Sequence, residues 1–212
     1  MEKEALLNEV HHRVKNNLQV ITSLLSLEAG RSNQPETRLV LQDMKGRIRS
    51  MALLHETLYR SGTFAAVELG SYLKQLATHA FRAQASNSSL IGLTLNLDSV
   101  TVSLDQATTC GLLVNELISN SLKHGYAQGG RGTVCIELFP VIPVDMRSPA
   151  QWCVRVSDTG AGLPDDFEQR CQQSLGMQLV SDLVRQLGGT LLIHHKPGAT
   201  FEVTFASKET GA

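Results

Sequence analysis

The first sixty residues carry apolar side chains at helical spacing, and this pattern constrains the fold more than any other feature of the sequence. Apolar residues recur every three or four positions, with no glycine or proline before Gly30, at Leu7, Val10, Val14, Leu18, Ile21, Leu24 and Leu25. After the loop-like segment 30–35, a second stripe occupies Leu41, Met44, Ile48, Met51, His55 and Leu58. Two such helices joined by a short loop form a helical hairpin. A lone hairpin cannot bury both stripes, so we expect it to pair with a second copy as a four-helix bundle or to fold against its own C-terminal part.

The rest of the chain alternates between strand and helix patterns. Helical spacing covers 69–85, 105–124 and 175–187, and alternation predicts strands at 91–97, 100–104, 133–139, 152–157, 190–195 and 201–205. The proline-rich stretch 140–151 is expected to be an exposed loop. This order predicts an α+β fold in which an α/β sandwich, with helices on one face of a mixed sheet, follows the hairpin. We place the hairpin at 1–62, the sandwich domain at 63–207 and a short tail at 208–212.

Composition excludes several classes of protein. The chain has 19 Lys and Arg against 20 Asp and Glu, so its net charge of −1 argues against a nucleic-acid or anionic-membrane partner. It contains no apolar run near the roughly 18 residues that span a bilayer, and its acidic, polar N-terminus is unlike a secretory signal. The four cysteines form no CxxC pair, which argues against a zinc ribbon or redox dithiol and favours a reducing, cytoplasmic compartment.

The segment HHRVKNNLQ at 11–19 is the first motif with chemical potential. With Leu7 and Val14 at core heptad positions, His12 falls at a solvent-facing position and His11 at the flank. An exposed imidazole near several basic and amide side chains can act as a nucleophile toward a phosphoryl group. Taken alone, the motif is explained more simply as a polar helix face that happens to hold two histidines.

The segment NELISNSLKH at 115–124 is the second motif. In an α-helix, Glu116, Asn120 and Lys123 would share one face at positions i, i+4 and i+7. Carboxylate, amide and ammonium groups on one stripe can hold Mg²⁺ and phosphate oxygens. A solvated helix face explains the charged residues equally well, but it does not explain asparagine, which is a mediocre helix former.

Two glycine-containing segments complete the set. In VSDTGAGLP at 156–164, a strand pattern ends in Asp158, which can accept a hydrogen bond from an amine, and Gly160 and Gly162 allow the backbone to approach a ligand. In QQSLGMQLV at 172–180, Ser174 can cap a helix whose N-terminal amides face an anion. An ordinary turn and an ordinary capped helix account for either segment on its own.

Taken together and in this order, the four motifs resemble those of the bacterial sensor histidine kinases. The stretch RIRSMALLHETLYRSG at 47–62 adds to the likeness, which runs from about Leu7 to Phe205 and favours the HRxKN-box (HisKA_2/HWE-like) subfamily with a Bergerat, or GHKL, ATPase domain. The resemblance implies ATP-dependent autophosphorylation on a histidine, followed by transfer to an aspartate of a response regulator receiver domain. It also implies ATP and Mg²⁺ as cofactors and a homodimer formed through the hairpin.

The resemblance assigns roles to individual residues. His12 matches the phosphoacceptor, and because Arg13 replaces the usual acidic neighbour, Glu9 is a candidate proton acceptor one turn earlier. Lys123 would neutralise phosphate charge, Asn120 would bind Mg²⁺, and Asp158 would read the adenine amino group. The implied nucleotide-binding set is Asn115, Glu116, Asn120, Lys123, His124, Asp158, Gly160, Gly162, Ser174, Leu175, Gly176 and Thr200. The usual Gly-Thr-x-Phe sequence reads GATF at 198–201, so the hydroxyl of Thr200 is displaced by one position.

Two alternatives stay open at this point. A degenerate kinase would hold nucleotide or a regulator as a scaffold, but the intact Asn120, Lys123 and Asp158 argue against it. A non-kinase ATPase of the same fold, or a serine kinase acting on an anti-sigma antagonist, would lack the hairpin with the HHRVKNNLQ motif.

Overall fold

The computed structural model describes residues 2–60, 66–84, 90–127, 130–142, 150–195 and 197–207. The chain forms two compact units, Met1–Thr63 and Phe64–Ala212, which we call the hairpin unit and the sheet unit. The expected boundary between residues 62 and 63 and the expected tail at 208–212 lie outside the described residues.

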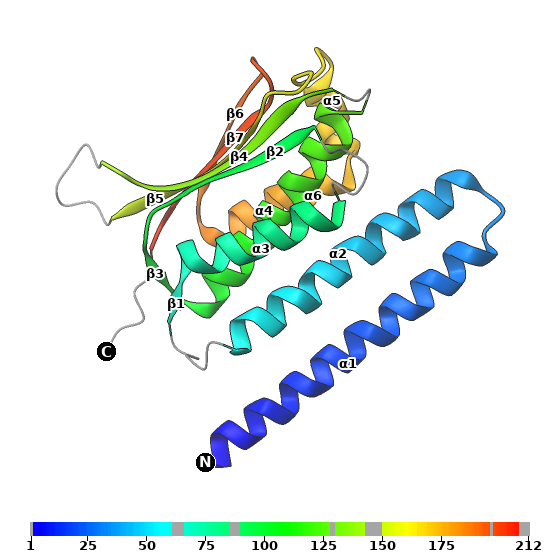
Figure 1. The fold of residues 1–212 in the computed structure, drawn as a ribbon, viewed down its shortest axis with the longest axis vertical. Coiled ribbons are helices and arrows are strands. Elements are labelled where there is room, and N and C mark those ends of the chain that lie inside the picture. The colour runs from blue at the N-terminus through cyan, green and yellow to red at the C-terminus, as the bar shows by residue number, and fades with distance from the viewer. Residues whose placement is uncertain are drawn as a thin grey trace. The chain divides into compact units, whose positions relative to one another are not determined.

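The hairpin unit consists of two long helices that lie side by side (Figure 1). Helix α1 spans Glu2–Arg31 and helix α2 spans Pro35–Arg60. The connection is shorter than the expected loop at 30–35, because α1 continues past Gly30 and α2 begins at Pro35 itself. Proline suits the first turn of a helix, where its missing N–H has no partner to lose. The predicted helical hairpin is confirmed.

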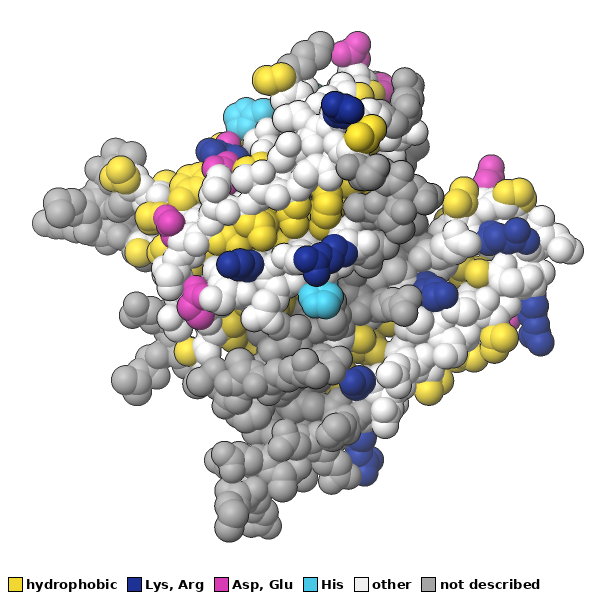
Figure 2. Space-filling model, in the orientation of Figure 1, with side chains coloured by type: hydrophobic (Ala, Val, Ile, Leu, Met, Phe, Trp, Pro, Cys, Tyr) yellow, Lys and Arg dark blue, Asp and Glu magenta, His cyan; other side chains and the backbone are white. Residues whose placement is uncertain are grey.

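Large apolar side chains remain at the surface of both hairpin helices. Val20, Leu24 and Leu27 on α1, and Leu39 and Val40 on α2, are each more than half exposed. Figure 2 shows hydrophobic side chains spread along the surface of this unit. Packing of α1 against α2 therefore leaves apolar surface uncovered, as expected for a two-helix unit.

The sheet unit is built on a five-stranded mixed sheet with the strand order β2-β4-β5-β7-β6. Its strands are β2 (Ile91–Leu97), β4 (Gly132–Val141), β5 (Gln151–Asp158), β6 (Thr190–His194) and β7 (Thr200–Ala206). Strand β2 runs parallel to β4, and all other neighbours are antiparallel, which confirms the predicted mixed sheet. A separate antiparallel pair joins β1 (Val67–Glu68) to β3 (Thr101–Val102).

Three helices cover one face of this sheet (Figure 1). They are α3 (Leu69–Gln84), α4 (Leu104–Asn120) and α6 (Leu175–Leu187), and α4 packs against both of the others. The strands turn alternate side chains towards these helices. The fully or nearly fully buried ones include Val134, Ile136 and Leu138 on β4, Val154 and Val156 on β5, and Phe201, Val203 and Phe205 on β7. The predicted sandwich is therefore confirmed.

The opposite face of the sheet carries paired charges. Glu137, Arg155 and Glu202 are neighbours in adjacent strands, with Arg155 Nη1 3.0 Å from Glu137 Oε2 and Arg155 Nε 2.9 Å from Glu202 Oε1. The guanidinium carbon of Arg155 lies 4.7 Å from the centre of the Phe139 ring. Trp152, the single tryptophan of the chain, belongs to the central strand β5.

Several local features differ from the sequence expectation. Strand β1 and helix α5 (Phe167–Gln173) had not been predicted, and β3 is shorter than the expected 100–104 because α4 already begins at Leu104. Strand β4 reaches Val141 and β5 starts at Gln151, so both strands extend into the expected loop. The expected helix 105–124 stops being α-helical at Asn120 and continues as the π-helix Ser121–Gly125.

Candidate functional site

The end of α4 supplies one wall of a cavity. Ser103 caps the start of this helix by accepting a hydrogen bond from the Gln106 backbone N–H. At the other end, the wider turn of the π-helix changes the rotation per residue after Asn120. Asn120, Ser121 and His124 line the cavity there. Such π-turns are frequent at functional sites because they reposition side chains without ending the helix.

Asp158, at the end of β5, is a buried carboxylate in the wall of the cavity. It is 4% exposed, and its Oδ1 accepts hydrogen bonds from the backbone N–H groups of Gly160 at 2.9 Å and Ala199 at 3.4 Å. Its Oδ2 has no hydrogen-bond partner within the described residues. One carboxylate oxygen is therefore fixed by the backbone, while the other remains available to a ligand.

Glycines allow the backbone segments around Asp158 to come close together. A Cβ on Gly160 would collide with the carbonyl group of Gly125, and one on Gly198 would collide with the carbonyl oxygen of Asp158. Gly162 and Gly198 also have φ angles of +78° and +72°, which favour glycine. Side chains at these positions would fill or distort the cavity.

Helix α5 closes another side through an aromatic contact. The ring of Phe167 meets the ring of His195 at 5.8 Å and that of Phe201 at 6.4 Å, both edge to face. Ser174 follows α5 and caps α6, since its Oγ accepts the backbone N–H of Met177 at 3.5 Å. Helix α5 therefore lies between Pro164 and Ser174, which both line the cavity.

The resulting cavity has a volume of about 610 Å³, within the range of small-molecule sites. The structure brings five of the expected nucleotide-binding residues together on its wall: Asn120, His124, Asp158, Gly162 and Ser174. The wall also holds Ser121, Phe167, Arg170, Cys171, Met177 and Phe201, which sequence reasoning missed. Apolar wall residues cannot be told from core residues in a sequence, because both follow the same periodic pattern.

The other expected residues of the nucleotide set do not line the cavity. Asn115, Glu116 and Gly176 are buried within α4 and α6, while Lys123 and Leu175 are exposed. Gly160 lies behind the wall, bonded to Asp158, and Thr200 lies in β7 between the wall residues Ala199 and Phe201. Lys123 departs from the expected face because that expectation assumed α-helical rotation through the π-turn. Glu9 and His12 lie in α1, but their side chains are outside the part that the structure describes.

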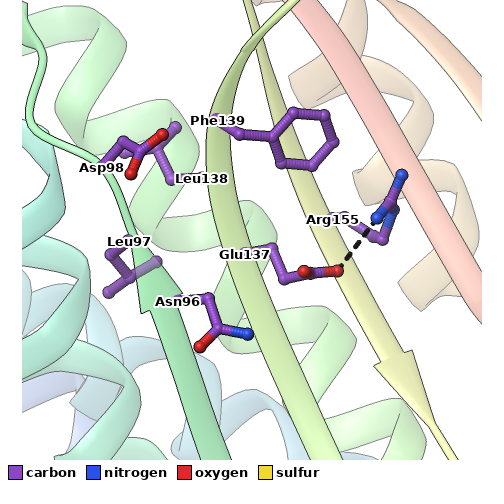
Figure 3. Close-up of a pocket in the computed structure, with 7 residues that line it drawn as sticks. All are labelled: Asn96, Leu97, Asp98, Glu137, Leu138, Phe139 and Arg155. Atoms are coloured by element: carbon purple, nitrogen blue, oxygen red, sulfur yellow. Dashed lines mark hydrogen bonds and ion pairs between the residues drawn. The ribbon is translucent and has the colours of Figure 1, made fainter.

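A second hollow, of about 390 Å³, lies on the outer face of the sheet (Figure 3). Asn96, Glu137, Phe139 and Arg155 are among its lining residues. The guanidinium of Arg155 is already paired with two carboxylates, so its positive charge does not need an anionic ligand. The cavity around Asp158 is the better candidate, because it holds a buried carboxylate with a free oxygen.

The cavity can bind a ligand with a hydrogen-bond donor at one end and negative charge at the other. Asp158 offers the acceptor, the apolar wall formed by Phe167, Met177 and Phe201 suits a flat ring, and the start of α6 lies beside Ser174. The described residues contain no group of three or more His, Cys, Asp or Glu side chains that would hold a metal alone. A Mg²⁺ ion fits this donor set through the amide oxygen of Asn120, because Mg²⁺ usually takes few protein ligands and completes its shell with phosphates and water.

Family comparisons assign both parts of the chain. Residues 9–84 match HisKA_2, a histidine kinase family, and residues 105–209 match HATPase_c, the histidine kinase-, DNA gyrase B- and HSP90-like ATPases.

None of the helices in the described ranges is long and apolar enough to cross a bilayer.

Individual relatives point the same way. The sensor histidine kinase PdtaS of Mycolicibacterium smegmatis is 32% identical over 206 residues, covering 96% of this chain and 39% of the relative. The blue-light-activated histidine kinase 2 of Erythrobacter litoralis is 28% identical over 194 residues, covering 90% of this chain and 53% of the relative. The chain thus spans well under two thirds of the length of both relatives.

Solved structures share the fold. The blue-light-activated histidine kinase EL346 of Erythrobacter litoralis matches with a TM-score of 0.70 and 25% identity, covering 98% of this chain and 60% of that one. The histidine kinase AdeS of Acinetobacter baumannii matches with a TM-score of 0.53 at 15% identity, a likeness of fold alone.

Proposed function

Because this chain belongs to the histidine kinases, with a HisKA_2 region followed by a HATPase_c domain, we propose that it is the catalytic core of a sensor kinase. It autophosphorylates on a histidine with ATP and passes the phosphoryl group to an aspartate of a response regulator receiver domain. The observation that carries the proposal is the cavity around Asp158. Five residues expected to bind nucleotide come to its wall from separate segments of the chain.

In this proposal one end of the cavity binds the adenine of the nucleotide and the other end binds its phosphates. The free Oδ2 of Asp158 accepts the amino group of adenine, and the aromatic wall packs against the base. Asn120 holds Mg²⁺ through its amide oxygen. The bound Mg²⁺ neutralises charge on the phosphates, which is the main requirement of phosphoryl transfer.

His12 is the proposed acceptor of the phosphoryl group. An imidazole with a pKa near 6.5 is largely neutral at pH 7, so a ring nitrogen has a free electron pair. That nitrogen forms a bond to the γ-phosphorus, and the bond between this phosphorus and the bridging oxygen breaks, so that ADP leaves with the electron pair. Glu9, three positions earlier on α1, accepts the proton that the ring then loses.

We further propose that the hairpin pairs with the hairpin of a second copy. The exposed apolar residues on α1 and α2 support this pairing, because a four-helix bundle would bury them.

The decisive experiment is autophosphorylation with γ-labelled ATP and Mg²⁺. We expect label that acid removes and base preserves, which is the signature of a phosphoramidate. His12→Gln should abolish labelling, while His11→Gln, the matched control one position away, should retain it.

The same assay separates the proposal from a scaffold that only holds nucleotide. A scaffold would bind ATP and acquire no label. Full labelling of His12→Gln would reject His12 as the acceptor, and undiminished Mg²⁺-dependent binding by Asn120→Ala would reject the assigned metal ligand.

A further inference from the structure

Asn120 and Met177 contact each other at the wall of the nucleotide cavity. Asn120 is the last residue of α4, and Met177 lies in the first turn of α6. The amide nitrogen Nδ2 of Asn120 lies 3.8 Å from the thioether sulfur of Met177. Met177 is 5% exposed, and both residues line the cavity.

This contact distinguishes the two ends of the amide. A thioether has no hydrogen to donate and acts only as a weak acceptor, whereas an amide has a donor end and an acceptor end. Nitrogen against sulfur is therefore attractive, while oxygen against sulfur would bring lone pairs together. The terminal torsion of asparagine is broad and roughly two-fold, so without such a neighbour both orientations are accessible.

The backbone of Met177 is held in place at the start of α6. Ser174 ends α5 and caps α6, and its hydroxyl oxygen accepts the backbone N–H of Met177. Helix α6 also packs against α4, so the two side chains approach each other from two fixed elements.

We propose that Met177 is a positioning residue for the metal ligand. By accepting the Nδ2 hydrogen of Asn120, it turns the Oδ1 atom away from the sulfur and keeps it available to Mg²⁺. This inference rests on the proposed function, in which Asn120 holds Mg²⁺. It adds that a buried methionine, rather than a charged residue, sets the orientation of that ligand.

The test compares nucleotide affinity with and without metal. A fluorescent ATP analogue is titrated into the whole chain in saturating Mg²⁺ and again in excess EDTA, and the ratio of the two dissociation constants gives the metal-dependent gain. Met177→Leu keeps the side-chain volume nearly constant and removes the acceptor. Leu183→Met is the matched control, since Leu183 is 4% exposed on the same helix and is not part of the cavity wall.

We expect Met177→Leu to reduce the affinity in saturating Mg²⁺ more than the affinity in EDTA, so that the metal-dependent gain falls about two- to fivefold. If the Asn120 amide is oriented correctly in only part of the molecules and its weak hydrogen bond is lost, the metal-dependent gain falls by a factor of about this size. Leu183→Met should change neither value.

Two results would overturn the proposal. One is an unchanged gain in Met177→Leu, and the other is an equal loss of affinity with and without metal, which indicates packing alone. A wild-type protein with no metal-dependent gain would instead refute the assigned Mg²⁺ site, so the two failures are distinct.

A second measurement covers the case in which Met177→Leu does not fold. Replacement of methionine by selenomethionine changes the acceptor atom and preserves the shape of the side chain. The side-chain amide resonances of Asn120, identified by their absence in Asn120→Asp, should then shift. Resonances that stay in place would show that the amide does not bond to this side chain.

Discussion

Replacing Asp158 by asparagine tests how the cavity recognises a base. The oxygen Oδ1 of Asp158 is bonded to two backbone N–H groups, and an asparagine oxygen can keep both bonds. The substitution then replaces Oδ2 by an NH₂ group, so that a hydrogen-bond acceptor becomes a donor. That donor opposes the amino group of adenine but matches the carbonyl oxygen of guanine.

The expected effect follows from this exchange. A hydrogen bond to a charged group is worth about 1.5–3 kcal/mol, so ATP affinity should fall by roughly tenfold to a hundredfold. GTP affinity should stay constant or rise, and the preference for ATP over GTP should therefore fall by at least about tenfold.

The assay is competition of unlabelled ATP and GTP against a fluorescent ATP analogue. Asp182→Asn is the matched control, because Asp182 is an exposed carboxylate on α6 that is paired with Arg185 at 3.1 Å. The reasoning fails if Asp158→Asn binds ATP within twofold of the wild type, or if ATP and GTP affinities fall in parallel.

Two further predictions concern a buried hydroxyl group and a thiol group that lines the cavity. The hydroxyl of Tyr72 is buried without a hydrogen-bond partner among the described residues, so Tyr72→Phe should raise the free energy of unfolding by about 1 kcal/mol in urea. Tyr126→Phe should lower the free energy of unfolding, because the Tyr126 hydroxyl donates to the Thr133 carbonyl oxygen at 3.0 Å. A Tyr72→Phe variant that is less stable than the wild type would contradict the argument. Burial raises the pKa of the Cys171 thiol, which lines the cavity, so alkylation at pH 8 should be slower than for free cysteine and should still accelerate above about pH 8.5. Bound ATP should slow this reaction, as peptide mass mapping of the alkylated residue would show, and equal rates with and without ATP would place the nucleotide elsewhere.

Long periodic segments were predictable from the sequence. The strand at Ile91–Leu97 and the helix at Leu175–Leu187 have the bounds that alternation and helical spacing indicated. Both segments bury one face, and burial is what the pattern records.

Short or polar segments were not predictable in the same way. Strand β1 has two residues, too few for any period. Helix α5 has the sequence FEQRCQQ, whose single aromatic residue packs on Phe201 and His195, so its position depends on contacts remote in sequence.

Some residues of the candidate site were likewise predictable from the sequence, and others were not. Asn120 was identified because asparagine is a mediocre helix former, and Asp158 because a carboxylate ends a strand pattern just before two glycines. The cavity-facing roles of Phe167 and Met177 were missed, because their sequence pattern is that of core residues. The π-turn after Asn120 has no signature that periodicity detects, and it removes Lys123 from the expected face.

The division into two compact units determines what spectroscopy can report about this protein. Trp152, the only tryptophan, lies in the central strand of the sheet unit, so its fluorescence follows that unit alone. Far-ultraviolet circular dichroism follows both, because α1 and α2 contribute 30 and 26 helical residues. Chains with two compact units need not unfold in one step. If the fluorescence and dichroism curves separate, the two units unfold in different steps, which is then seen within a single sample and without cutting the chain.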